Sequence, residues 1–213
     1  MRKATDNLRH DHDHILIALD AIDRALWNAA RGQRSIEFFE LALEFVVVYA
    51  DGAHYDKEEL LFAAVLAHPM PPAAGPIGCL NMEHDATRAQ AARMGAALDA
   101  VRAGDASEWF ALMDALVRYT TIIRVHLPKE NAGFFPMSDQ VLGPDVQAEL
   151  LARFEAIDRA LPATIQSIAA SLQQRAPIVV ANAPVRVEAS HVDKYQLYDE
   201  RLAAALEQLL VDR

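Results

Sequence analysis

The sequence predicts an all-α protein, built as an antiparallel up-and-down four-helix bundle with additional C-terminal helices. Alanine and leucine dominate the composition and only 8 of the 213 residues are glycine, which favours helices. Apolar residues recur in steps of three and four, the spacing of one helix face. Short connections between long amphipathic helices favour antiparallel neighbours. Hydrophobic residues make up 53% of the chain, enough to fill one core.

The first helix is predicted over residues 8–26 and ends before Gly32, a poor helix former. Its apolar face carries Leu8, His12, Ile15, Leu19, Ile22 and Leu26. Ser35 as an N-cap and Glu37 in the first turn open a second helix, which extends to about Ala67. One side of this second helix carries Val47, His54, Glu58, Leu61 and Val65.

Two further helices follow a loop at residues 68–78, which contain four prolines and two glycines. The third helix ends at Gly104, and its apolar face carries Leu80, His84, Thr87, Ala91, Met94, Leu98 and Val101. Asp105 and Glu108 have the spacing of a capping box at the start of the fourth helix. Its apolar face carries Leu112, Leu116, Tyr119, Ile123, His126 and Glu130. Pro128 predicts a kink or a local change of pitch between His126 and Glu130.

The pattern divides the chain into a four-helix bundle at residues 1–142 and a C-terminal helical extension at 143–213. The extension carries another apolar face, with Pro162 as a kink: Leu150, Phe154, Ile157, Leu161, Ile165, Ile168 and Leu172. This face covers either the bundle or a second subunit, which leaves a homodimer open. Residues 176–190 are predicted to be a short proline-containing linker or a strand pair, and a last helix is expected over residues 192–211.

Composition also limits the classes of function. The net charge of −10 argues against a nucleic-acid or anionic membrane surface as partner. No targeting signal opens the sequence, and no apolar run approaches the roughly 18 residues of a membrane span. Cys79 is the single cysteine, so an intrachain disulfide is excluded and a reducing, cytoplasmic location is expected. We interpret Cys79 as a small buried hydrophobe rather than a redox thiol.

Six metal-binding side chains lie on the apolar faces of the four predicted helices: His12, His54, Glu58, His84, His126 and Glu130. Burying each of them without a partner costs several kcal/mol. His12 lies 20 residues before Gly32 and His54 lies 22 after it, while His84 lies 20 before Gly104 and His126 22 after it. In an antiparallel bundle this counting places all four imidazoles in one layer. A metal pair explains the arrangement, and the alternative is a polar network satisfied by protein groups alone.

The ligand types and spacings limit the metal. His54 and Glu58 are four residues apart, so they project side by side from one helix. Glu58 and Glu130 lie on different helices, where they are suited to bridge two cations. Six ligands exceed one tetrahedral zinc site. Imidazole with carboxylate suits iron, manganese or zinc, and the lack of cysteine ligands argues against an iron–sulfur cluster.

Four segments resemble the signatures of hemerythrin-like (HHE cation-binding) domains, and the resemblance covers roughly residues 5–142. They are residues 8–15 (LRHDHDHI), 54–62 (HYDKEELLF), 83–88 (EHDATR) and 126–136 (HLPKENAGFFP). The resemblance implies two non-haem iron ions, oxo- or hydroxo-bridged, that bind O2, NO or peroxide, or sense iron and oxygen. It implies His12, His54, His84 and His126 as terminal ligands, and Glu58 and Glu130 as bridges.

Two departures from the family's oxygen carriers argue against simple oxygen storage. The carriers place a second histidine four residues before the position of His84, where this chain has Leu80. They also use a longer gap, to an aspartate, than the spacing of His126 and Glu130. A missing imidazole leaves one iron under-coordinated, so water, Glu83 or Glu59 is expected to fill the place.

Neighbouring residues are interpreted differently from the six ligands. His10 and His14 share the face opposite His12 and are expected to be solvated or to lie outside the ligand shell. Asp11 is a candidate to orient a ligand imidazole through its second nitrogen. Tyr55 and Tyr119 are expected to be packing residues.

Three functions remain open from the sequence. The first is a cytoplasmic binding or sensing protein for O2, NO, iron or redox state, which needs no groups beyond the ligands. The second is an enzyme that reduces or disproportionates peroxide, O2 or NO, with Glu59 or Tyr55 as proton donor. The third is an interaction module with a structural metal. No other catalytic motif is evident, so binding or sensing is preferred.

Overall fold

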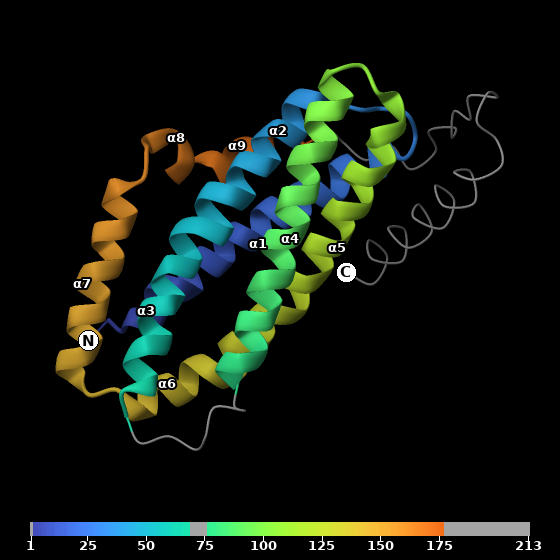
Figure 1. Cartoon of the computed structure of the whole chain (residues 1–213). Coiled ribbons are helices and arrows are strands. Elements are labelled where there is room, and N and C mark those ends of the chain that lie inside the picture. Colours follow the sequence, from blue (N-terminus) through green and yellow to red (C-terminus); the bar gives the residue numbers. More distant parts are fainter. Residues whose placement is uncertain (1, 69–75, 177–213) are drawn as a thin grey trace.

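The computed structural model describes residues 2–68 and 76–176, and within them every regular element is a helix (Figure 1). The elements are α1 (Ala4–Ala29), α2 (Ile36–Glu44), η1 (Phe45–His54), α3 (Tyr55–Leu66), α4 (Pro76–Arg102), η2 (Ala106–Glu108), α5 (Trp109–Lys129), η3 (Glu130–Phe134), α6 (Phe135–Val141), α7 (Pro144–Ala160), α8 (Ala163–Gln166) and α9 (Ile168–Arg175). Of these, η1 and η3 are π-helical and η2 is a 3₁₀ turn. The predicted all-α class is confirmed for the described residues.

Local sequence sets the ends of the first two helices. At the start of α1 the Asp6 carboxylate accepts a hydrogen bond from the Lys3 backbone N–H at 2.8 Å, which caps the free N-terminal groups. After α1 the chain turns at Gly32, whose φ of 82° is a conformation that L side chains rarely adopt. The Ser35 hydroxyl accepts from the Phe38 N–H at 3.2 Å, so Ser35 is the predicted N-cap of α2.

The second predicted helix is continuous, but its middle is the π-helical segment η1. A π-helix bonds residue i to i+5, so each turn takes up more residues than an α-helical turn. Val46 is therefore fully buried, whereas Val47 is 50% exposed. The prediction that Val47 shares the buried side of His54 is wrong for this reason.

The helix α4 begins earlier than predicted. Its first residue is Pro76, because proline has a helical φ and the first position of a helix needs no N–H donor. The loop therefore ends before Gly78, and residues 69–75 lie outside the described part of the chain. Cys79 is exposed, so its interpretation as a buried hydrophobe is wrong. The next residue, Leu80, is buried instead, because successive side chains on a helix point in different directions around its axis.

The start of α5 differs in detail from the predicted capping box. The Asp105 carboxylate accepts from the Ser107 N–H at 3.0 Å and caps the short turn η2, and α5 begins only at Trp109. Pro128 stays inside α5, and the helix changes to the π-helical segment η3 at Glu130. The predicted change of pitch is present, and it begins at Glu130, the last residue of the predicted interval.

The C-terminal helices pack on the rest of the described chain. Phe154 of α7 and Leu172 of α9 are fully buried, and α7 lies beside α3 while α9 lies along α1 (Figure 1). Pro162 separates α7 from α8, a sharper break than the predicted kink. The apolar face of the C-terminal extension thus packs on helices of the same chain. The homodimer and the boundary at residue 143 stay predictions, and residues 177–213, which include most of the predicted linker and the last helix, lie outside the described residues.

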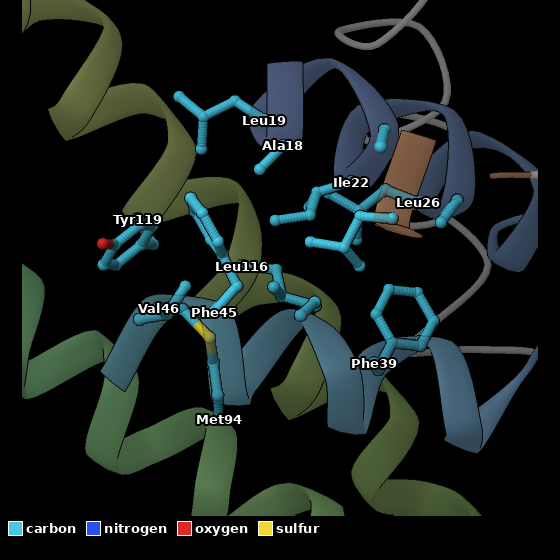
Figure 2. Close-up of a cluster of buried hydrophobic side chains, with 14 of the residues drawn as sticks. Ala18, Leu19, Ile22, Leu26, Phe39, Phe45, Val46, Met94, Leu116 and Tyr119 are labelled. Atoms are coloured by element: carbon cyan, nitrogen blue, oxygen red, sulfur yellow. The ribbon is translucent and has the colours of Figure 1, made fainter. Parts of the chain in front are cut away.

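Two apolar clusters surround the layer of the predicted site. The larger cluster fills the space between α1, α2, η1, α4 and α5, as Figure 2 shows for Ile22, Leu116 and Met94. The smaller one contains Leu8, Phe62 and their neighbours at the other end of the molecule. None of the described helices combines the length and apolarity that crossing a membrane requires.

Candidate metal centre

All six predicted ligands meet between the two apolar clusters. Each of them is at most 1% exposed: His12, His54, Glu58, His84, His126 and Glu130. Their donor atoms form two overlapping groups, and within each group every atom lies within 4.8 Å of the others. Both groups share the two glutamates, and each has two histidines of its own. The layer predicted by counting residues along the helices is therefore present.

The first group combines His12 of α1 and His54 of η1 with the two glutamates. His54 Nε2 lies 3.0 Å from Glu58 Oε1, a contact that follows from their spacing of four residues on one helical face. His12 Nε2 lies 3.3 Å from Glu130 Oε2 and 3.8 Å from Glu58 Oε1. One end of each carboxylate therefore faces this pair of imidazoles.

The second group combines His84 of α4 and His126 of α5 with the same glutamates. His84 Nε2 lies 3.1 Å from Glu58 Oε2, the other oxygen of that carboxylate. His126 Nε2 lies 3.2 Å from Glu130 Oε2. The contact between these two residues confirms that they share a direction despite Pro128. The two oxygens of Glu58 thus face different pairs of histidines, as a bridging carboxylate requires.

The arrangement of the donor atoms suits cation binding better than a network of hydrogen bonds. Six of these buried atoms have no hydrogen-bond partner among the described residues: His12 Nε2, His54 Nε2 and both carboxylate oxygens of Glu58 and of Glu130. Such buried unpaired groups cost about 1–3 kcal/mol each, and more when charged. The two remaining nitrogens, of His84 and His126, face each other at 3.3 Å. Ligands about 2.1 Å from one ion lie roughly 3 Å apart when adjacent, which is the spacing found here.

Two carboxylates hold the outer nitrogens of two histidines. His54 Nδ1 lies 3.2 Å from Asp11 Oδ2, and His126 Nδ1 lies 2.9 Å from Glu83 Oε2. These contacts fix the rings so that each Nε2 faces the centre, the arrangement usual for metal-bound histidine. The predicted role of Asp11 is confirmed as a contact, and the matching role of Glu83 was missed, although each residue directly precedes a predicted ligand histidine.

The other two histidines are held by uncharged groups. His12 Nδ1 lies 3.0 Å from the amide oxygen of Asn131, a residue that the sequence analysis did not identify. The ring of His84 stacks on Tyr55 with centroids 3.7 Å apart and an angle of 14° between the planes. The Tyr55 hydroxyl lies 3.0 Å from Thr87 Oγ1. All four imidazoles are thus oriented by packing or hydrogen bonding before any cation binds.

The buried carboxylates shift the pKa values of their neighbours. Burial alone lowers the pKa of His54, but the charge of Glu58 and the hydrogen bond to Asp11 outweigh it and raise that pKa to about 10. Burial also lowers the pKa of His126, and Glu130 outweighs it and raises that pKa to about 9. Burial raises the pKa of Glu58, but the charge of His54 holds it well below its usual range. A cation entering the cluster must therefore displace protons.

The residues expected to replace a missing imidazole do not do so. Leu80 is 2% exposed and belongs to the smaller apolar cluster. Glu59 is exposed on the outside of α3, where it pairs with Arg88 at 3.2 Å. Glu83 binds the outer nitrogen of His126 instead of facing the donor atoms. The prediction that Glu59 or Glu83 completes the ligand set is wrong, because both carboxylates are turned outward.

The remaining candidates lie outside the donor cluster, as predicted. His10 is exposed, and half-buried His14 contacts the Tyr49 hydroxyl through Nδ1 at 3.0 Å. Tyr119 is fully buried in the larger apolar cluster, and its hydroxyl donates to Asp51 Oδ1 at 2.8 Å. Tyr119 thus combines its predicted packing role with one hydrogen bond.

The model of the family described as hemerythrin, "Hemerythrin HHE cation binding domain", matches residues 3–138. This range contains all six predicted ligands and ends before α7. No match was found among curated proteins or among solved structures.

Proposed function

The chain belongs to the hemerythrin HHE cation-binding domain family, and on that premise we propose that it is a non-haem di-iron protein. Its proposed role is to bind or sense a small diatomic ligand, O2 or NO, or to report iron or redox state. One observation carries the proposal: six buried donor atoms in the described structure lack hydrogen-bond partners and face one another. Bound cations would compensate these unpaired buried groups, which are costly without partners.

The proposed ligand sets follow the two groups of donor atoms. His12 and His54 would hold one ion, His84 and His126 would hold the other, and Glu58 would bridge them together with Glu130. Imidazole with carboxylate is a donor set that iron accepts, and manganese or zinc are the alternatives. We place this centre in an antiparallel up-and-down four-helix bundle, in keeping with the long helical segments that lie side by side in Figure 1.

The surroundings of the donor atoms favour binding over turnover. Iron, when bound, would supply an electron-rich metal ion to which small diatomic molecules bind. The apolar clusters on either side keep bulk water away from this layer. The buried hydroxyls of Tyr55 and Tyr119 make hydrogen bonds with Thr87 and Asp51. Glu59, the other candidate proton donor, is exposed on the outside of α3. An enzyme needs a proton donor within reach of the substrate, and the contacts of these three side chains are made with groups outside the donor set.

Absorption spectroscopy of the ferrous protein tests the proposal. Full-length protein loaded with iron under anaerobic conditions is exposed separately to O2, NO and peroxide. We expect a new near-ultraviolet and visible band with O2 or NO that disappears when the gas is removed. Peroxide turnover without a stable band would instead support the enzyme. Tightly held iron with no spectral response would support the interaction module.

Compartment and assembly belong to the same proposal. A reducing cytoplasm suits a chain whose single cysteine, Cys79, is exposed. A homodimer stays a prediction, and sedimentation or light scattering of the iron-loaded chain tests it.

A further inference from the structure

The residues of the candidate centre occur twice in the sequence, with a constant separation of 72 positions. The equivalent pairs are Leu8 and Leu80, Asp11 and Glu83, His12 and His84, His54 and His126, Lys57 and Lys129, Glu58 and Glu130, and Phe62 and Phe134. Each half thus contains an acidic residue directly before one histidine, followed 42 residues later by a second histidine in the string H-x-x-K-E. Seven matches in residue type at one separation indicate an internal repeat of two halves.

The repeat explains the leucine at position 80. Its equivalent in the first half is Leu8, and both leucines are buried in the smaller apolar cluster, at 0% and 2% exposure. Phe62 and Phe134, also equivalent, contact each other edge to face with ring centroids 5.0 Å apart. Each half therefore offers the same donors, two imidazoles and one carboxylate, and neither half lacks a ligand relative to the other.

The two halves also share a chain of contacts behind the second histidine. In the first half, His54 Nδ1 contacts Asp11, and the same Asp11 oxygen lies 2.6 Å from Lys57 Nζ. In the second half, His126 Nδ1 contacts Glu83, whose other oxygen pairs with Lys129 Nζ. The lysine therefore holds the carboxylate that orients the imidazole in both halves.

The halves differ in what covers the lysine. Lys57 is 1% exposed, and its ammonium also contacts Asp158 Oδ1 of α7 at 2.7 Å and Asn7 Oδ1 at 2.9 Å. Asn7 in turn donates to the second oxygen of Asp158 at 2.8 Å. Three oxygen contacts use all three donors of an ammonium group. Because the family match ends at residue 138, Asp158 is an addition to the matched domain.

The equivalent pair in the second half lies at the surface. The side chains of Lys129 and Glu83 are 42% and 20% exposed. Glu83 also lines an apolar surface pocket of about 720 Å³ between α4 and α5, next to Met82 and Val125. Exposed ion pairs hold their partners weakly, whereas a buried charge that loses its partner is strongly unfavourable. Glu83 is thus held less firmly than Asp11.

We propose that Lys57 and Lys129 are equivalent positioning residues for His54 and His126, and that Asp158 locks only the first half. The ion held by His12 and His54 then exchanges slowly, while the ion held by His84 and His126 exchanges quickly on the side of the surface pocket. This inference rests on the proposed function, because it requires two bound ions.

The release of iron to a chelator tests the inference on the full-length protein. The protein is loaded anaerobically with Fe²⁺ and mixed with an excess of a coloured ferrous chelator, and the absorbance is followed. We expect two phases of one ion each. Asp158→Asn should accelerate the slow phase about tenfold and leave the fast phase unchanged, since loss of a residue that supports a ligand typically weakens binding 10–100-fold. Lys129→Met should accelerate only the fast phase, and Lys129→Arg should restore it.

Controls separate positioning from general loosening. Glu155→Gln, on the same helix as Asp158 but with a side chain that is 42% exposed and pairs with Arg2, should change neither phase. Release of both ions in a single phase, or equal acceleration of both phases by Asp158→Asn, would overturn the inference. A wild-type protein that binds two ions and loses them in phases insensitive to Asp158 and Lys129 refutes this inference alone. A protein that binds no iron refutes the proposed function as well.

Discussion

Gly52 is the residue at which the path of the second helical segment can be tested most sharply. It lies in η1, where the turns are π-helical, two residues before His54. A Cβ placed on Gly52 would lie 2.8 Å from the backbone oxygen of Val47. This oxygen belongs to the residue five positions earlier, which a π-helical turn brings close. Because the contact is with backbone rather than with a flexible side chain, Gly52→Ala forces η1 to move.

Gly133 provides the matched control, because it lies in the other π-helical segment, η3, and a Cβ there would meet nothing within 4 Å. Gly→Ala inside a helix ordinarily stabilises by about 0.5–1 kcal/mol. Gly133→Ala should therefore raise the free energy of unfolding by about that amount. In Gly52→Ala the same gain is opposed by overpacking of about 1–3 kcal/mol, so a net loss of up to about 2.5 kcal/mol is expected.

Urea unfolding of the metal-free protein, followed by far-ultraviolet circular dichroism, measures both changes. Since η1 ends at His54, Gly52→Ala should also lower the amount of bound metal, while Gly133→Ala should not. If both variants stabilised the protein equally, the close approach at Gly52, and with it the π-helical path to His54, would be refuted.

Three further predictions concern charges and hydrogen bonds. Lys57→Met should lower the free energy of unfolding of metal-free protein by about 3–5 kcal/mol, and Lys129→Met, which removes an exposed pair, by at most about 1 kcal/mol; similar losses in urea unfolding would contradict this. Burial raises the pKa of Asp51 from 3.8 to about 6. Between these pH values the folded state therefore binds more protons than the unfolded state, and the free energy of unfolding falls by up to about 3 kcal/mol as the pH rises. Asp51→Asn should remove this pH dependence, so that the variant is more stable than wild type at pH 8 but not at pH 4. A difference in stability that does not change with pH would contradict the prediction. Asn131→Ala frees His12 Nδ1 and should weaken metal binding about 10–100-fold in a chelator competition, whereas unchanged affinity would deny Asn131 a positioning role.

Much of the fold follows from local sequence signals, and the errors have a physical cause. Ser35 and Gly104 mark helix ends through capping and a left-handed turn, so the pattern locates them well. Periodicity of 3.6 fails inside η1, and for that reason Val47 is exposed while Val46 is buried. Nothing in the composition of this apolar stretch distinguishes a π-helical from an α-helical turn.

The candidate centre was predictable where its residues lie on helices whose ends the sequence marks, because the position of each residue along the bundle can then be counted. The six donor side chains were found because counting from Gly32 and Gly104 places the histidines at one level. Asp158 was not predictable, because its contact with Lys57 joins residues 101 positions apart through a helix whose docking no local pattern specifies. Asn131 was missed because an asparagine after a glutamate is ordinary on a helix surface.

Metal content per chain tests the central claim most directly. Full-length protein purified without chelator is analysed for transition metals beside the double variant Glu58→Gln/Glu130→Gln, which keeps the side-chain volume and removes both bridging carboxylates. The account predicts two ions per chain in the wild type and none in the double variant. A wild type without transition metal, or a double variant that keeps both ions, would contradict it.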